Sequence, residues 1–242
     1  MENRQDIIND ILGELKQETN IAIDLPSKGL LYDYANEEDR NVYIRPMTFE
    51  DEKTLANSKK GAKDPINLLL ERCVSNINVL DLYLFDKLYI LMKLREISYG
   101  NTYDSIIVCP KCSAEAEISI LIDKLPVDFV DDNFTDPIEI ELPVIKKVAK
   151  VKLPKVRDEK YFSNVDNLGG NLWRFILEIN GVSDETIISE VVNKLPLVDT
   201  KTIIKNLDIK KGIKTKIHYE CDSCGGGSII DLPINENFFN VN

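Results

Sequence analysis

The sequence predicts an α+β protein: a mainly helical N-terminal unit with a small strand pair, plus a split zinc-ribbon-like pair of β-hairpins that carries a helical insertion. Three observations favour this class. Apolar residues follow helical spacing through much of 48–98, alternate along 103–122, and alternate again along 213–234. Both alternating segments surround a Cys-x-x-Cys pair. With 242 residues, the chain is long enough to bury a sizeable core.

The composition argues against several classes of protein. Lys and Arg number 30 against 41 Asp and Glu, a net charge of −11, which disfavours a protein that coats a phosphate backbone. No run of about 18 apolar residues is present, so we expect no transmembrane helix. The first residues lack the order of a signal peptide, and we expect a protein made in the cytosol. The one histidine, His218, excludes a two-histidine metal triad.

Residues 5–18, within an N-terminal segment 1–20, are predicted to form a short amphipathic helix. Its apolar face consists of Ile7, Ile8, Ile11, Leu12 and Leu15, with Asp6, Asp10, Glu14 and Lys16 on the other side. Two interpretations stay open. The helix packs on the core of its own chain, or it docks on a partner, because a helix this short is marginal alone.

Residues 21–102 are predicted to form the strand pair and the helical unit. Apolar residues on both sides of Pro26-Ser27-Lys28-Gly29 indicate a strand, a tight turn and a second strand over 21–32. A further short strand is expected at 41–46. Three helices should follow, at about 48–60, 64–77 and 81–98, with Thr48 and Asp64 at their starts and Gly100 at the end of the last.

Four of the five cysteines form two Cys-x-x-Cys pairs at the hairpin tips: Cys109, Cys112, Cys221 and Cys224. Two residues between the thiols let a turn aim both at one tetrahedral ion, and in a reducing compartment this spacing favours a metal over disulfides. We predict that the four thiolates hold one structural Zn²⁺ and leave no position for water. The fifth cysteine, Cys73, lies on an apolar helix face and is expected in the core.

The separation of the two pairs requires an insertion. Zinc-ribbon pairs are usually about 15–20 residues apart, whereas Cys112 and Cys221 are far more distant in the sequence. The predicted β lobe is therefore split into 103–144 and 213–234, around a helical insertion lobe at 145–212, and a tail follows at 235–242. Within the insertion, the stripe of Leu172, Phe175, Ile176 and Ile179 predicts one helix, and further helices are expected from about Asp184 to Lys194 and from near Asp199. Redox dithiols, or tips without metal, are the alternatives. His218 could replace a cysteine ligand but is expected to pack or to face solvent.

A series of short motifs resembles a known family. In order, they are Leu25-Pro26-Ser27-Lys28-Gly29 with Tyr32, then Ile44-Arg45-Pro46-Met47-Thr48, then a helix with Asp86 that ends in Leu94-Arg95-x-x-Ser98-Tyr99-Gly100, then Cys109-Pro110-x-Cys112. Over roughly residues 20–125 this order resembles the T4-type phage baseplate protein family. Its best-known member is a small subunit of the baseplate central hub, or a factor in building that hub.

The resemblance implies a viral tail protein without catalysis. Its expected partners are other baseplate hub and tail proteins, with no nucleic acid and no membrane, and a cyclic oligomer within the baseplate is one option. Its expected location is the host cytoplasm during assembly and the virion tail baseplate.

Two other functions stay as alternatives. One is a zinc-ribbon module acting on transcription or nucleic acid, which the net charge and the acidic neighbours of the second tip, Glu220 and Asp222, oppose. The other is an enzyme that uses carboxylates such as Asp131, Asp132, Glu139 and Glu141. An acidic run is usually a solvated loop, so we predict no enzymatic activity.

Overall fold

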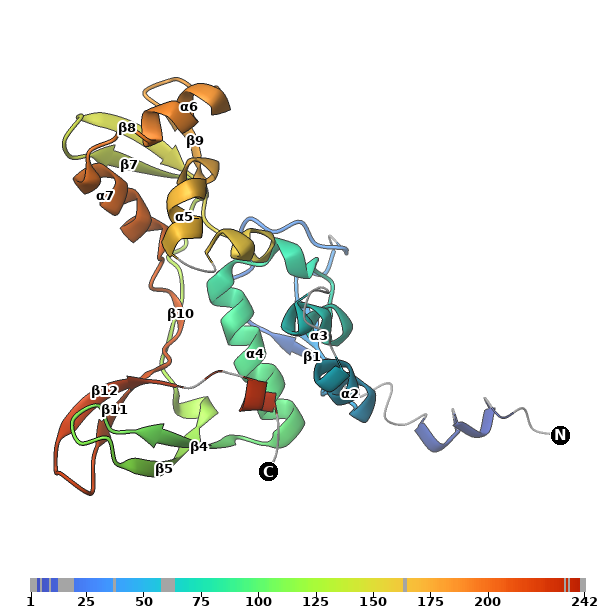
Figure 1. Cartoon of the computed structure of the whole chain (residues 1–242). Coiled ribbons are helices and arrows are strands. Elements are labelled where there is room, and N and C mark those ends of the chain that lie inside the picture. Colours follow the sequence, from blue (N-terminus) through green and yellow to red (C-terminus); the bar gives the residue numbers. More distant parts are fainter. Residues whose placement is uncertain are drawn as a thin grey trace.

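The computed structural model describes residues 4, 6–8, 10–12, 20–36, 38–57, 64–162, 165–232, 234 and 236–239. The chain forms three parts around the central helix α4 (Leu84–Tyr99), as Figure 1 shows. A body of helices and a small sheet surrounds α4, two β-hairpins lie at one end, and a lobe of helices and strands lies at the other. Among the described helices, none has the length and apolar character needed to cross a bilayer.

The body packs a small sheet and short helices against α4. Its other elements are β1 (Ile21–Ile23), β2 (Val42–Ile44), α2 (Phe49–Asn57), α3 (Pro65–Cys73), β3 (Val74–Ser75) and the 3-10 helix η1 (Val79–Asp81). The strands form one antiparallel sheet in the order β1-β2-β3. Ile44, Leu69 and Ile90 are completely buried in the core of the body, so apolar burial stabilises this part of the chain.

Capping groups explain where the body's helices begin and end. The Asp64 carboxylate accepts a hydrogen bond from Ile66 N at 2.8 Å and starts α3. Before α2, Thr48 N donates to Asp51 Oδ2 at 2.9 Å. Gly100 ends α4 with a φ of 93°. The three expected helices are confirmed in their described parts, although α3 ends at Cys73, where β3 begins.

The second strand expected within 21–32 is wrong. Residues 26–31 form a turn, in which Leu31 has a φ of 63° and leaves the extended backbone. Tyr32 points inward: its hydroxyl donates to Asp86 Oδ2 at 2.6 Å and accepts from Tyr83 N at 2.9 Å. Hydrogen bonds to α4 therefore replace strand pairing here, and β1 pairs with β2 instead.

Further hydrogen bonds fasten separate segments to the two ends of α4. Near its start, the completely buried Asp86 also accepts a bond from Ser27 N at 3.0 Å. Near its end, Ser98 Oγ accepts from Met47 N at 2.9 Å. Three of the motifs quoted above thus contribute residues that contact one another around α4.

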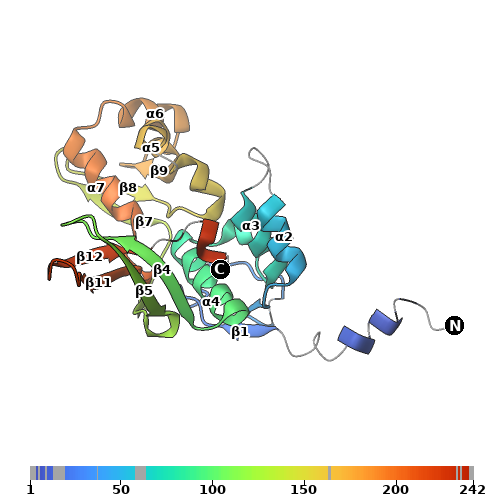
Figure 2. The same ribbon diagram turned by 60° about the horizontal axis from the view of Figure 1, so that its bottom comes forward.

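The two hairpins have the positions that the alternating patterns predict. One joins β4 (Thr102–Val108) to β5 (Glu115–Leu121), and the other joins β11 (Lys216–Glu220) to β12 (Gly227–Asp231). They lie side by side in Figures 1 and 2, although most of the sequence's second half separates them.

A narrow connection joins the hairpins to the lobe. After the 3-10 helix η2 (Ile122–Lys124), the chain leaves through β6 (Val127–Asp128) and returns through β10 (Gly212–Ile213), and these two strands pair antiparallel. Gly212 has a φ of 86°, and a Cβ there would lie 3.0 Å from the backbone oxygen of Phe85. Glycine therefore lets β10 approach α4 closely.

The lobe at the other end has its own core and its own sheet. Its elements are β7 (Ile138–Leu142), β8 (Lys147–Val151), η3 (Val156–Tyr161), α5 (Val165–Asn171), η4 (Leu172–Phe175), β9 (Ile176–Ile179), α6 (Glu185–Val192) and α7 (Leu197–Leu207). The sheet has the order β7-β8-β9. Buried residues from these elements form a second apolar cluster.

The helix expected on the stripe 172–179 is wrong. These residues form a 3-10 turn and then β9, because β8 offers a strand edge with which they pair. The strand β7 lies in the same sheet, so residues expected in the split β lobe and in the helical insertion share one core. The expected helices that start after Asp184 and near Asp199 are confirmed as α6 and α7.

The N-terminal and C-terminal segments differ in burial. The described residues between 4 and 12 are helical and exposed, and the rest of the helix expected at 5–18 lies outside the described residues. In the C-terminal segment, the 3-10 helix η5 (Glu236–Phe239) packs back on the body, and Phe238 and Phe239 are buried there. Phe238 contacts the ring of Tyr103 with the ring centroids 5.0 Å apart.

Candidate metal centre

The two cysteine turns have the same backbone construction. After the first pair, Ser113 N donates to Cys109 O at 2.9 Å, and after the second, Gly225 N donates to Cys221 O at 2.7 Å. Ser113 and Gly225 both have positive φ, 60° and 65°. Positive φ at the residue after the second cysteine of each pair lets the chain turn back, so that both thiols of the pair face the same side.

The four sulfur atoms from the two turns meet in one cluster. Cys109 Sγ lies 3.9 Å from Cys224 Sγ, and Cys112 Sγ lies 3.7 Å from Cys221 Sγ. All four lie within 4.8 Å of one another. Four thiolates about 2.3 Å from one tetrahedral Zn²⁺ would be about 3.8 Å apart, whereas a disulfide needs about 2.05 Å. The spacing therefore fits four ligands of one ion and does not fit a bonded pair.

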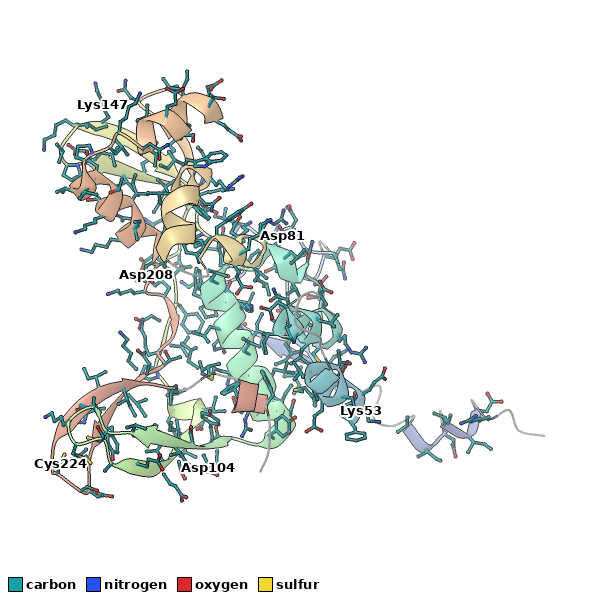
Figure 3. All side chains as sticks on the ribbon, in the orientation of Figure 1. Lys53, Asp81, Asp104, Lys147, Asp208 and Cys224 are labelled. Atoms are coloured by element: carbon teal, nitrogen blue, oxygen red, sulfur yellow. The ribbon has the colours of Figure 1, made fainter. Side chains whose placement is uncertain are left out.

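Burial is divided in the same way in both turns. The first cysteine of each pair, Cys109 and Cys221, is buried, and the second, Cys112 and Cys224, is exposed. Figure 3 shows Cys224 at the far end of the hairpins, remote from the body. The cluster thus lies at the tip of the hairpin pair, where no apolar core surrounds it. It is the point at which the two tips meet.

The environment shifts the pKa values of the thiols in opposite directions. The pKa of Cys221 is lowered to about 6, first because the Tyr219 hydroxyl lies beside it, although this buried hydroxyl forms no regular hydrogen bond with the described residues. A bond from the backbone at Ala114 lowers the pKa of Cys112, but Cys224 and the other thiols outweigh it and raise the pKa to about 12. Crowded thiols resist losing all their protons, and a divalent cation would relieve this repulsion.

Neighbouring groups support the turns. Lys111 N donates to Cys109 Sγ at 3.4 Å, an N–H···S bond that stabilises a thiolate. The side chain of Lys111 crosses to the other turn, since a Cβ at Gly226 would lie 2.6 Å from Lys111 Cδ. The absence of a side chain at Gly226 therefore lets one turn pack closely on the other.

The remaining candidate residues do not join this cluster. Among the residues that the structure describes, the four cysteines are the one group of three or more His, Cys, Asp or Glu close enough to share an ion. His218 is exposed on β11, opposite Ile229. Cys73 is buried in the body as expected, and burial raises the pKa of its thiol to about 12.

The carboxylates considered for catalysis are dispersed. Asp132 pairs with Lys28, and Asp131 lies 3.8 Å from Lys211. Glu139 and Glu141 are exposed on β7, in the other lobe.

Two buried carboxylates of the body were not singled out by their chemistry in the sequence. Asp86 lies at the start of α4, where burial raises its pKa to about 6. Asp51 is buried opposite Arg45 and Arg72, at 2.7 and 2.6 Å, and these bonds outweigh desolvation and lower its pKa. Asp86 is a polar residue among apolar ones in the sequence, but its partner Ser27 is 59 residues away. Asp51 stands between Glu50 and Glu52, and nothing local distinguishes it from these two residues.

The comparisons with known proteins agree with the resemblance in the motifs. A family model described as "T4 bacteriophage base plate protein" matches residues 18–240, which include all four cysteines and both lobes. No curated protein and no solved structure matches the chain.

Proposed function

The chain belongs to the T4 bacteriophage base plate protein family, and from this we propose that it is a structural or assembly component of the baseplate central hub. Membership in the family supports a structural role in a phage baseplate and, with it, partners among baseplate and tail proteins. The assignment to the central hub is our proposal. Under this proposal, the protein acts in the host cytoplasm during assembly and in the virion tail baseplate, and it does not catalyse a reaction.

We further propose that Cys109, Cys112, Cys221 and Cys224 bind one structural Zn²⁺. The observation that carries this is the meeting of four thiols, from hairpins remote in sequence, at distances that suit tetrahedral coordination. When bound, zinc would supply a fixed cross-link. Four sulfur ligands leave no open position for water or substrate.

The proposed division of the chain follows from this cross-link. Residues 103–144 and 213–234 supply the two halves of the zinc-bound lobe, residues 145–212 are inserted between them, and 21–102 form the body. The inserted part has an apolar cluster separate from that of the body, which supports our treating it as a lobe. The strand β7, from the preceding segment, contributes buried residues to this cluster.

The hairpin pair also offers an interaction surface. Ile106 and Val108 point to the same face of β4, immediately before the first cysteine, and they are 62% and 57% exposed. We propose that a hub protein covers this face. A rigid cross-link between the tips would then keep the apolar face in the geometry that its partner needs.

Metal analysis of the full chain tests the centre. Protein purified without added metal should contain one zinc per chain, and Cys112→Ser/Cys224→Ser should contain none. The matched control Cys73→Ala removes a thiol outside the centre and should keep the zinc. Zinc-free wild-type protein that also fails to bind added Zn²⁺ would refute the site.

Co-expression with each hub protein tests the interface. The wild type should co-purify with at least one hub protein, and Ile106→Ser/Val108→Ser should lose that partner while it keeps its zinc. The control Val148→Ser/Leu177→Ser changes two exposed apolar residues of the other lobe and should bind as the wild type does. Absence of every baseplate protein from the purified complex would refute the hub proposal.

The nucleic-acid alternative finds no support near the cysteines. The exposed side chains around the tips include Glu115, Glu117, Glu220 and Asp222 beside the basic Lys111. Such a surface repels phosphate, and we expect no salt-dependent binding to duplex DNA.

A further inference from the structure

Tyr219 brings a buried hydroxyl to the cysteine centre. It stands two residues before Cys221 in the sequence, and residues two apart on a strand point to the same side. Burial follows this alternation, because Tyr219 is partly buried, Glu220 is exposed and Cys221 is buried. The hydroxyl oxygen of Tyr219 is itself buried, yet it has no hydrogen-bond partner among the residues that the structure describes. An unpaired polar atom in such a place is costly and requires an explanation.

The first hairpin has no hydroxyl at the matching position. Two residues before its first cysteine stands Ile107, which is 7% exposed. The two turns otherwise share their backbone construction, since Ser113 and Gly225 both have positive φ and donate to the carbonyl of the first cysteine. An aliphatic side chain thus meets the packing requirement at this position, and the hydroxyl is what Tyr219 adds.

The acceptors nearest to this hydroxyl are sulfur atoms. It lies beside Cys221 and is close enough to Cys109 to be affected by the charge of that thiol, and Asp222 also acts on it. A neutral thiol is a weak acceptor, whereas hydrogen bonds to an ionised acceptor are about twice as strong as those between neutral groups. The Tyr219 hydroxyl therefore suits Cys221 as a metal-bound thiolate better than as a free thiol.

We propose that the Tyr219 hydroxyl donates a hydrogen bond to Cys221 Sγ when the four thiolates hold a metal ion, and that this bond positions Cys221 and strengthens metal binding. Tyr219 is thus a positioning residue and not a ligand, and its role rests on the proposed zinc site. Each buried cysteine then has its own donor, because Lys111 N already donates to Cys109 Sγ at 3.4 Å. Groups that orient metal ligands in this way typically contribute about 10–100-fold to metal affinity.

Zinc affinity of the full chain tests the proposal. Tyr219→Phe removes the hydroxyl and keeps the ring, and it should weaken Zn²⁺ binding by about tenfold in competition with a chromophoric chelator. The matched control Tyr43→Phe removes a hydroxyl that donates to Asp39 in the body, remote from the cysteines, and should bind Zn²⁺ as the wild type does.

Co²⁺ in place of Zn²⁺ gives a readout that a packing role of Tyr219 would not change. The energy of the sulfur-to-cobalt charge-transfer absorption depends on the electron density at the thiolates, and a hydrogen bond to Cys221 Sγ lowers that density. The band should therefore move to lower energy in Tyr219→Phe, while the cobalt d–d bands keep the pattern of tetrahedral coordination. Tyr43→Phe should leave the whole spectrum unchanged.

Three outcomes would overturn the proposal, and they separate it from the zinc site. Wild-type affinity for Zn²⁺ in Tyr219→Phe would overturn the role of the hydroxyl and leave the zinc site intact. A weaker affinity with an unshifted charge-transfer band would do the same, because it would assign Tyr219 a packing role alone. Wild-type protein that binds neither Zn²⁺ nor Co²⁺ would refute the zinc site, and the role of Tyr219 with it.

Discussion

The body around α4 and the pair of hairpins are held together by different forces. In the body, side chains such as Leu69, Ile90 and Leu94 are completely buried. In the described strands β11 and β12, no side chain is fully buried. Two-stranded hairpins are marginally stable alone. The first hairpin is different, because Tyr103 of β4 and Ile120 of β5 are buried in the core of the body. The difference teaches that the body and the base of the first hairpin can fold by apolar burial, whereas the second hairpin depends on the proposed cysteine centre to hold its tip to the first.

Removal of the cysteine centre should give the largest difference in stability between the hairpins and the body. Structural zinc contributes on the order of 10 kcal/mol at neutral pH, so Cys221→Ser, or a chelator, should unfold the second hairpin and leave the body folded. Hydrogen exchange should become fast in 216–231 and stay slow in α4. Slow exchange in the second hairpin after complete zinc removal would show that side-chain packing alone holds it.

Asp51→Ala should have the converse effect. It removes a buried carboxylate between Arg45 and Arg72 and should lower the free energy of unfolding of the body by about 3–5 kcal/mol, because two arginines lose their counter-charge. Denaturant unfolding measures this, and the zinc content should not change. Glu52→Ala, at the next position of α2, should stay within about 0.5 kcal/mol of the wild type.

Asp86 should give the body a pH dependence of its own. Burial raises its pKa from 3.8 to about 6, so between these values the folded state binds more protons than the unfolded state. The free energy of unfolding should therefore fall as the pH rises through that window, by about 2–3 kcal/mol in all. Exchange of the α4 amides measures it, and Asp86→Asn should remove this dependence. An unchanged slope in the variant would assign it to another group.

The same contrast explains what could be predicted from the sequence. The hairpins and their four cysteines were predictable because alternation and Cys-x-x-Cys spacing are local signals, and α4 because its apolar spacing is long and ends at Gly100. The pattern at Leu172, Phe175, Ile176 and Ile179 suits a helix equally well, and only the edge of β8, distant in sequence, selects a strand. Likewise, nothing near Tyr32 in the sequence indicates that Asp86, 54 residues away, will bind its hydroxyl.

The smallest expected effect compares the two cysteine turns themselves. Both need positive φ after the second cysteine, but Gly225 adopts it freely while Ser113 does so under strain. Gly225→Ala should weaken zinc binding by about 1 kcal/mol, or roughly fivefold, through the backbone alone, since nothing lies within 4 Å of the added Cβ. Ser113→Gly should leave the affinity equal or slightly higher. Competition with a chromophoric chelator measures both, and a loss of affinity in Ser113→Gly would mean that its side chain, rather than its backbone, supports the turn.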